Sequence, residues 1–492
     1  MATEKEKNGD DDGRSARRWR QYLAAVVVNI AGFISGTAYG WTAPILPVLQ
    51  SENSPVGIPP ITEVDASWLA SIINLTRIVA TPAFMYVNDR YGRKITGYAI
   101  AALSILSWAM MLYANSVTMI FSARVIIGIS SGGIVLLVPA FTSDFAEDDI
   151  KGRLAAIFGL SMNLGATFSY AAGNYASYPV YHASCLLVPV LFAACFFRLP
   201  ESPLFLMTAG RTKEAEDSLR WYRAGQDCDL ELERVRARAS EALDKRNRKV
   251  ALSGVFDKPT LRALLITMGL LTNKQLGGAT VVTTFTVSIF QQSGSAMSPG
   301  LSTVAIGLLL VFGTLASALV VERFGRRPLL LYTDLFIGAC LAALGTFLYL
   351  KDAGRVSGSL GWIPLACLSG YILGLSLALG PMTFTVATEM VAASAKGPVQ
   401  TVCSVYGALV AFASAFSYAP LARAAGQHGA FWLFSAVCLV GSAGVFLTMP
   451  ETKGRSAEDV VEQLRGDRYV RSVLRGPPRK STSDARSVPH VL

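Results

Sequence analysis

Two neighbouring polar side chains, Lys274 and Gln275, interrupt a long apolar region of the sequence. An ammonium group donates hydrogen bonds and attracts anions, whereas an amide group donates and accepts at once. A second pair, Asn74 and Arg77, lies in another apolar region, at a spacing that places both side chains on one side of a helix. Groups of these types are suited to binding a polar solute.

Catalytic chemistry is not indicated. The sequence contains no metal-ligand cluster, nucleophile elbow or phosphate-binding loop. We therefore expect no enzyme activity, no metal and no cofactor.

Long uncharged segments surround the polar residues. The chain is 52% hydrophobic and 16% charged, against about 25% charged in soluble proteins. Because a membrane-spanning helix needs about 20 mostly apolar residues, we predict an all-α integral membrane protein and disfavour a large soluble helical protein. The uncharged runs cover 21–51, 95–123, 154–197, 275–321, 356–388, 397–422 and 424–450.

Twelve transmembrane helices are predicted from these runs. Turns at Pro179 and at 293–295 divide the two longest runs. The predicted spans lie at about 22–46, 68–87, 95–114, 117–141, 154–175, 180–199, 261–290, 299–321, 328–350, 362–387, 398–420 and 429–449.

Lysine and arginine are concentrated in every second connection. They precede residue 21, follow the second and eighth spans, fill 200–260 and follow residue 450, whereas the alternate loops contain only Lys351, Arg355 and Arg423. Since positive charge stays on the cytoplasmic side, we predict that both termini are cytoplasmic. The net charge of +10 then faces the anionic lipid of the bilayer, and a nucleic-acid partner is not indicated.

An internal repeat divides the chain into two pseudo-symmetric halves of six helices. The motif DRYGRK at 89–94 returns as ERFGRR at 322–327, and PESP at 200–203 has its counterpart in PETK at 450–453. Such a parallel repeat is typical of transporters. We predict a cytoplasmic tail (1–20), an N-terminal half (21–199), a cytoplasmic linker with amphipathic helices (200–260), a C-terminal half (261–450) and a second cytoplasmic tail (451–492).

The repeated acids and bases predict a cytoplasmic gating network. Pairs of this kind would join the ends of neighbouring helices, and a network that forms in the outward-open state and breaks in the inward-open state would bias transport. The alternative is that these charges only set the membrane topology. The candidates are Asp89, Arg93, Asp144, Lys151, Glu201, Glu322, Arg326, Glu389, Lys396 and Glu451.

The ordered motifs resemble the sugar porter family of the major facilitator superfamily, and within it most resemble insect facilitated trehalose transporters. The resemblance covers 20–460 and implies the major facilitator fold, a sugar substrate and the cell membrane. It rests on GTAYGWTAP at 36–44, DRYGRK at 89–94, Arg124 with Gly128, PAFTSD at 139–144, PESPLFL at 200–206, ERFGRR at 322–327, Gly380 with Pro381, and PETKG at 450–454.

The sugar-contacting positions depart from that family. Span seven reads KQLGGAT at 274–280 where the family has two glutamines and an asparagine, and Gly159, Phe384 and Gly407 replace a glutamine, a tryptophan and an asparagine. The glycines at 277–278 can loosen the helix where it lines a cavity. The substrate-binding candidates are Lys274, Gln275, Thr280, Thr284, Phe384, Arg77 and Asn74.

Cations at mid-membrane cost about 2.5–3.5 kcal/mol each on insertion scales. We expect no carboxylate at the depth of Lys274 and Arg77, with Asp334 near the inner surface, and a structural pairing for Arg124. Lys274 and Arg77 would contact solute in a central aqueous cavity; alternatively they extend to the interface or bond backbone carbonyls.

Facilitated diffusion by alternating access is favoured over proton coupling. The first span has no Asp or Glu, and His182, His428 and His490 are expected in outer loops or the tail. Three classes stay open: a facilitator for a small-molecule sugar (hexose or trehalose), a porter of the same fold for another organic solute, including an anion, and a sensor that binds solute without transporting it. The sequence does not specify an oligomeric state.

Overall fold

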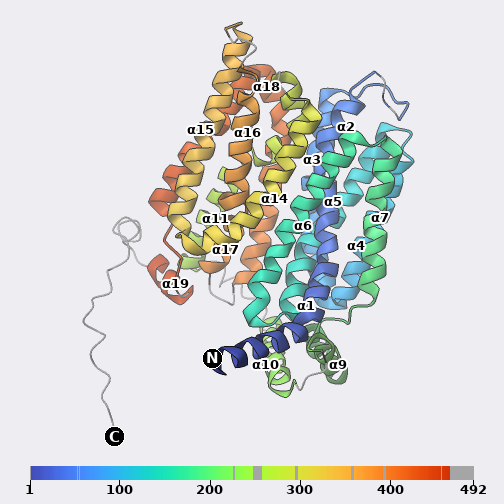
Figure 1. The fold of residues 1–492 in the computed structure, drawn as a ribbon, viewed down its shortest axis with the longest axis vertical. Helices are drawn as coiled ribbons and strands as arrows, with labels where there is room; N and C mark the ends of the chain where they lie inside the picture. The colour runs from blue at the N-terminus through green and yellow to red at the C-terminus, as the bar shows by residue number, and fades with distance from the viewer. Residues whose placement is uncertain are drawn as a thin grey trace, which may run out of the picture.

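The structure, a computed structural model, describes residues 2–52, 54, 56–224, 228–247, 257–293, 297–355, 360–391, 395–455 and 457–465. In this described part the elements are helices, and they form two groups that stand side by side (Figure 1). The blue-to-green helices of the N-terminal half form one group, and the yellow-to-red helices of the C-terminal half form the other.

The N-terminal group contains long helices. Those of the bundle are α1 (Ala2–Gly40), α2 (Thr42–Leu49), α3 (Glu63–Tyr91), α4 (Arg93–Leu112), α5 (Val117–Phe145), α6 (Asp148–Tyr175) and α7 (Tyr178–Phe197). Three further helices follow below the bundle in Figure 1: α8 (Pro203–Thr208), α9 (Thr212–Tyr222) and α10 (Asp229–Asn247).

The C-terminal group is more fragmented. Its elements are α11 (Lys258–Leu276), α12 (Ala279–Thr284), α13 (Thr286–Ser293), α14 (Pro299–Arg323), α15 (Arg326–Asp352), α16 (Ile363–Gly374), the π-helix η3 (Leu375–Leu379), α17 (Gly380–Glu389), α18 (Lys396–Thr448) and α19 (Ala457–Arg465).

The helices are consistent with twelve crossings. Ten helices of the described part are long and apolar enough to cross a membrane. One of them, α18, covers the last two predicted spans and bends at Gly426, whose backbone is not helical. The seventh predicted span falls on the three short helices α11, α12 and α13.

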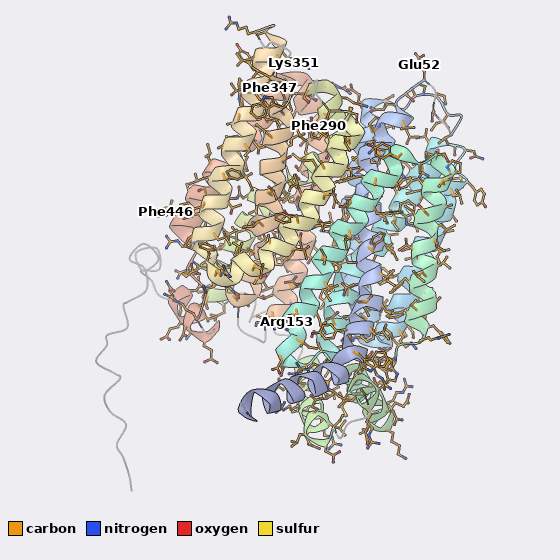
Figure 2. The ribbon with its side chains drawn as sticks, in the orientation of Figure 1. Glu52, Arg153, Phe290, Phe347, Lys351 and Phe446 are labelled. Atoms are coloured by element: carbon orange, nitrogen blue, oxygen red, sulfur yellow. The ribbon has the colours of Figure 1, made fainter. Side chains whose placement is uncertain are left out.

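Apolar side chains cover the flanks of the bundle, as in a protein surrounded by lipid. Val79, Leu187, Phe312 and Val440 are each at least 60% exposed, and Phe446 projects from the outer edge of the C-terminal group in Figure 2. A soluble protein rarely exposes continuous apolar surface on this scale. The chain is therefore a multi-pass membrane protein.

Small residues allow α1 and α6 to pack closely. A Cβ atom at Gly36 would lie 2.0 Å from the carbonyl oxygen of Met162, and one at Gly165 would lie 2.3 Å from that of Phe33. Such close approach between membrane helices is made possible by glycine. The contact makes the N-terminal group a tightly packed unit.

The two groups meet along α3 with α18 and along α6 with α14. Asn163 of α6 donates a 2.6 Å hydrogen bond to Thr314 Oγ1 of α14, and Tyr170 Oη donates to the carbonyl of Thr283 at 2.8 Å. On the other seam the rings of Trp68 and Phe416 are 4.9 Å apart. These polar and aromatic contacts each join one pair of side chains, so they can break and be replaced by other contacts when the two groups move.

The helices α8, α9 and α10 form a separate small core. Val235 and Ala239 of α10 are buried with Leu206 and Leu219, as the predicted amphipathic pattern requires. Leu230, on the same helix, is 82% exposed and lies outside this core. Most of the predicted C-terminal tail, 466–492, lies outside the described residues.

We call the end of the bundle that carries Arg18 and α8–α10 the terminal face. In Figure 2, Arg153 lies toward this end, and Glu52 and Lys351 lie at the opposite end. Arg18 forms an ion pair with Glu147 at 2.8 Å, and Arg223 donates to the carbonyl of Phe145 at 2.9 Å. These bonds attach α1 and α9 to the connection between α5 and α6.

Candidate functional site

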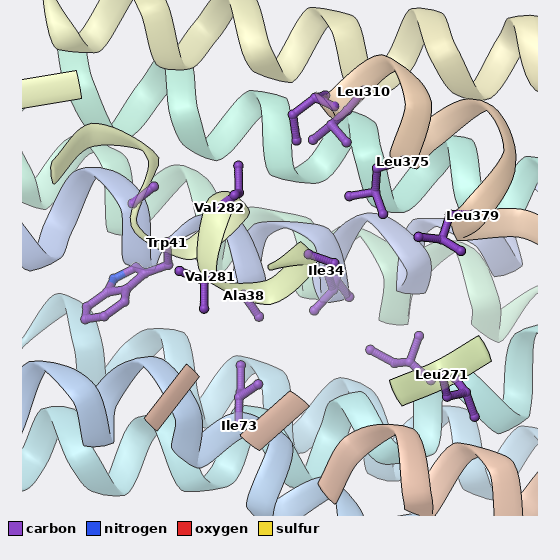
Figure 3. Packing of buried hydrophobic residues seen from close by; sticks show 14 of the residues in the cluster. Ile34, Ala38, Trp41, Ile73, Leu271, Val281, Val282, Leu310, Leu375 and Leu379 are labelled. Carbon is purple, nitrogen blue, oxygen red and sulfur yellow. The ribbon is translucent and has the colours of Figure 1, made fainter. Parts of the chain in front are cut away.

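Two helices of the C-terminal half are interrupted beside the N-terminal half. The helix α11 ends at Leu276, and Gly278 has a φ of 94°, a left-handed conformation that glycine adopts without a steric penalty. The second interruption is η3, immediately before Gly380. Figure 3 labels buried apolar residues of α1, α12 and η3 that belong to one core cluster, among them Ala38, Val281 and Leu375. The predicted loosening at 277–278 is thus present.

Lys274 lies in the last turn of α11, and its ammonium forms no hydrogen bond or ion pair with any described residue. The side chain is half-buried. Its Nζ atom lies 6.0 Å from the ring centroid of Phe384 on α17, the outer limit of a cation–π interaction, which would contribute about 0.5–1 kcal/mol. The structure therefore brings these two candidates together and leaves the hydrogen-bonding capacity of the ammonium free.

Arg77 and Asn74 are joined through a residue that the sequence analysis did not single out. Arg77 Nη1 donates to Tyr39 Oη of α1 at 2.9 Å, and that hydroxyl donates to Asn74 Oδ1 at 3.2 Å. Arg77 Nε and Asn74 Nδ2 are buried without a partner in the described part of the chain. Tyr39 lies within the motif at 36–44, which was the available signal for it.

The remaining candidates differ in their hydrogen bonds to the helix break. Gln275 accepts a 2.7 Å hydrogen bond from Thr280 across the break, and its backbone carbonyl accepts one from Ser414 of α18 at 2.8 Å. Thr284 is buried at the end of α12 and shares no hydrogen bond with the other candidates. Its predicted place beside them in one binding group is not reproduced by these contacts.

The two groups of candidates lie near each other across the seam. Arg77 of the N-terminal half is close enough to Lys274 of the C-terminal half for the two cations to repel. Together they hold three donors that bond no described residue: Lys274 Nζ on a half-buried side chain, and Arg77 Nε and Asn74 Nδ2, which are buried. A ligand rich in acceptor oxygens would satisfy all three, because every unused atom in this set is a donor.

Arg124 is held by backbone, as predicted for a structural residue. Its Nη1 donates to the carbonyl of Ala38 at 2.6 Å, its Nε donates to that of Leu69 at 3.1 Å, and the guanidinium lies 4.9 Å from the Trp41 ring centroid. The side chain is 1% exposed. Arg124 therefore fastens α5 to α1 and α3.

Two predictions about titratable residues are wrong. His182 lies in α7 rather than in a loop, and it is buried, with Nε2 accepting from Trp41 Nε1 at 2.9 Å. Asp334 is also fully buried, and its Oδ2 accepts a 2.8 Å bond from Asn273, the residue before Lys274. A carboxyl group is thus present next to the interrupted helix. Helix packing sets the depth at which Asp334 of α15 meets Asn273 of α11, and the pattern of charges along the sequence does not show this depth.

The predicted charge network separates into two clusters. In the N-terminal cluster, Arg93 forms an ion pair with Asp144 at 2.8 Å, and Ser202 Oγ donates to the same carboxylate at 2.7 Å. Glu201 accepts instead from the backbone N–H groups of Arg93 and Lys94. A carboxylate at this place stabilises the positive end of α4.

The C-terminal cluster repeats this arrangement. Arg326 forms an ion pair with Glu389 at 3.3 Å, and Thr452 Oγ1 donates to Glu389 at 2.5 Å. Glu451 accepts from the backbone N–H groups of Arg326 and Arg327 at 2.8 and 3.2 Å. Glutamates 201 and 451 therefore cap helices rather than pair with arginine side chains, which the sequence analysis did not foresee.

Four further candidates complete the predicted network. Lys151 and Lys396 form no ion pair with any residue that the structure describes, contrary to expectation, and Lys396 is exposed. Asp89 lies on the exposed last turn of α3. Glu322 belongs to α14, and its side chain lies outside the described part of the chain.

Each cluster joins helices of one half only. The ion pairs link α4 to α5 and α15 to α17. The bonds given for these clusters do not cross the seam, so they would act on transport by stiffening the end of each half.

The paired halves, the interrupted helices and the polar group between them define a membrane transporter of the major facilitator type. The family model described as "Sugar (and other) transporter" matches residues 24–464. The chain therefore belongs to the sugar (and other) transporter family, whose members are transporters and not enzymes.

The curated relatives include insect proteins named facilitated trehalose transporter Tret1. The one from Polypedilum vanderplanki is 29% identical and covers 91% of this chain and 88% of its own length. The one from Culex quinquefasciatus is 30% identical, covering 91% and 86%. The chain spans 55% of the length of the Aedes aegypti relative, with 29% identity.

Solved structures show the same fold. The inward-open xylose transporter XylE from E. coli has a TM-score of 0.74 at 17% identity, covering 89% of this chain and 99% of that one. The POT family transporter PepTSo has a TM-score of 0.61 at 14% identity, covering 87% of this chain and 97% of that one.

Proposed function

We propose that the protein carries a sugar, a hexose or trehalose, across the membrane by facilitated diffusion with alternating access. The family assignment and the trehalose transporters among its relatives support the substrate class. The observation that carries the proposal is the approach of Lys274, in the last turn before one helix break, to Arg77 of the other half, close enough for the two cations to repel. Arg77 is in turn bonded to Tyr39, and Tyr39 to Asn74.

The interrupted helices supply the mobile part of this mechanism. Helix breaks at a midplane site are a recurrent feature of transporters, because they free backbone and side-chain groups for the solute. Gln275 and Thr280 face each other across one break. Movement of α12 relative to α11 would exchange that bond for bonds to sugar hydroxyls, which donate and accept as an amide does.

The terminal face is proposed to be cytoplasmic and the membrane to be the cell membrane. Among the described residues, Arg18 and Arg20 of α1 and Arg220 of α9 lie at this face, which agrees with the positive-inside rule. The two charge clusters lie at the same face, at the first residues of α4 and α15. We propose that they stiffen the cytoplasmic ends of the halves during rocking.

Uptake into proteoliposomes tests the proposal. Purified protein is reconstituted, and entry of radiolabelled trehalose, glucose and xylose is measured without an ion gradient. The expected result is entry that saturates and stops at equal concentrations. Binding without entry would indicate a sensor, and accumulation above equilibrium would contradict facilitated diffusion.

An organic anion is the second candidate substrate. It is favoured by the three unused donors and by the two cations that repel each other across the seam. A carboxylate or phosphate between Lys274 and Arg77 would relieve this repulsion and accept from both, and bonds of this charged type are about twice as strong as neutral ones.

Replacing Lys274 separates the two substrates. If the cargo is a sugar, Lys274→Gln should preserve or raise uptake, because glutamine donates and accepts. If the cargo is an anion, uptake should fall about tenfold or more, since a charged hydrogen bond contributes about 1.5–3 kcal/mol. The control is Lys396→Gln, which removes an exposed lysine and should change neither.

A further inference from the structure

Behind the interrupted helix lies a polar pair, Asn273 and Asp334, that the proposed transport function does not use. The Asp334 side chain is completely buried and that of Asn273 is 4% exposed. A single 2.8 Å hydrogen bond joins them, from Asn273 Nδ2 to Asp334 Oδ2. Gly441 of α18 lies directly against the amide, since a Cβ atom there would come within 2.1 Å of Asn273 Oδ1.

The pair contains two oxygen atoms without a partner. Asn273 Oδ1 and Asp334 Oδ1 are both buried and accept no hydrogen bond in the described part of the chain. An ionised carboxylate in this setting would hold a full charge with one hydrogen bond. The cost of burying an unpaired charge is several kcal/mol, so a neighbouring group must neutralise it or it must bind a proton.

The surrounding titratable groups do not neutralise Asp334. Tyr371 of α16 and Cys438 of α18 face it, and both direct their hydrogens to the carbonyl of Gly277, at 2.9 Å and 4.0 Å. The π-helix η3 carries no titratable residue, and Glu389 of α17 is paired with Arg326. Lys274 follows Asn273 on α11 but forms no ion pair with Asp334.

One proton satisfies both oxygens at once. If Asp334 Oδ1 carries hydrogen, it can donate to Asn273 Oδ1 while Asn273 Nδ2 donates to Asp334 Oδ2, which closes an eight-membered ring of acid and amide. We propose that Asp334 and Asn273 form a proton-binding site in which Asp334 is a neutral acid. A metal cation fits less well, because two free oxygens are far fewer than the six or more that Ca²⁺ and Mg²⁺ require.

The position of the site connects its proton to helix movement. Asn273 lies in the last turn of α11, and its own carbonyl accepts from the N–H of Gly277 at the break. Asp334 lies on α15, which does not share that break. Withdrawal of α11 from α15 would separate the ring and admit water, and the proton would then leave. The closed arrangement is therefore favoured at low pH.

Infrared spectroscopy tests the site without reference to transport. Reconstituted wild-type protein at neutral pH should show the carbonyl stretch of a protonated carboxyl group, and Asp334→Asn should lack it. In Asn273→Ala the band should remain and move to higher frequency, because the acid loses its amide partner. Absence of the band in the wild type overturns the proposal, and so does a band that is unchanged in Asp334→Asn.

Thermal unfolding at several pH values gives an independent result if the spectra overlap. The Asp334→Asn side chain can form both ring bonds at any pH, so its unfolding temperature should vary less with pH than that of the wild type. Relative to this variant, the wild type should lose stability as pH rises, since the bound proton is released. The control is Asp217→Asn, an exposed aspartate of α9, which should follow the wild type.

The expected effect of this proton on transport rests on the proposed function, and it is measured separately from the infrared band. Sugar exchange at equal pH on both sides should change with pH in the wild type, by at most about tenfold per pH unit for one proton, and should be flat in Asp334→Asn. A flat wild-type profile overturns the link between the proton and helix movement. A carrier that fails to move sugar still shows the infrared band, so the two failures are distinguishable.

Discussion

The two halves repeat one sequence pattern but differ in how they treat their polar groups. In the N-terminal half the helices α3 to α7 are unbroken, and the buried Arg124 is bonded to two carbonyls and a tryptophan ring. In the C-terminal half two helices are interrupted, and Lys274, beside one of the breaks, forms no hydrogen bond or ion pair with a described residue and lies only near the Phe384 ring. The difference indicates a rigid N-terminal half and an adaptable C-terminal half.

The two cations make this contrast specific. The guanidinium of Arg124 bonds α5 to α1 and α3, so it acts as a structural cross-link. Lys274 lies at a helix break and contacts only an aromatic ring, at 6.0 Å. A buried polar group that is left unsatisfied costs stability, and proteins retain such groups where function uses them.

The largest expected effect is the loss of Arg124. Arg124→Leu removes the two hydrogen bonds from the guanidinium to the carbonyls of Ala38 and Leu69, and bonds to a charged group contribute about 1.5–3 kcal/mol each, so the unfolding temperature in detergent should fall by many degrees. Lys274→Leu should leave it equal or higher, since it removes a cation that has no partner. If both variants were equally destabilised, the contrast between the halves would be wrong.

The two charge clusters at the terminal face allow the halves to be compared by the stability of matching ion pairs. The side chains of Arg93 and Asp144 are 12% and 5% exposed, against 18% and 28% for Arg326 and Glu389. Because solvent screens the more exposed pair, Asp144→Asn should cost about 2 kcal/mol and Glu389→Gln about 1 kcal/mol or less. Urea unfolding of the two variants measures this order, and the reverse order would contradict it.

Gly278 tests whether the break itself is required. Gly278→Ala forces a side chain into the left-handed region, at about 1 kcal/mol, and brings a methyl group to 3.1 Å from the Phe434 ring. Uptake should slow several-fold while the fold persists. The matched control is Gly269→Ala in α11, the helix before the break, where nothing lies within 4 Å and alanine should stabilise the helix slightly.

The sequence predicted the fold because composition, loop charge and repeated motifs are local properties. It also located Lys274, Arg77 and the helix break, since cations and paired glycines are conspicuous in apolar segments. It did not predict which residues would meet. Tyr39 bridges Asn74 and Arg77 from another helix, and Asp334 meets Asn273 at a level set by helix packing. Such contacts depend on the relative shift of helices, which no single segment encodes.

The helix caps were missed for a related reason. A glutamate near a basic motif predicts an ion pair, whereas Glu201 and Glu451 instead accept from the backbone at the start of α4 and α15. Gly92 and Gly325 make room for them, since a Cβ atom at either would lie 2.5 Å from the carboxylate. The glycine in each repeat was a signal for this close approach.

The smallest expected effect is at the opposite face, where Glu63 of α3 forms an ion pair with Arg423 of α18 across the seam. Both side chains are more than half exposed, so the pair should contribute less than about 1 kcal/mol and should weaken with salt. Arg423→Gln should therefore raise sugar exchange slightly at low salt and leave it unchanged at high salt. Sugar exchange at two salt concentrations measures this. A large effect that is independent of salt would mean that the halves are held together by this pair, and the rigid-and-adaptable contrast would then have to be replaced by a latch at the opposite face.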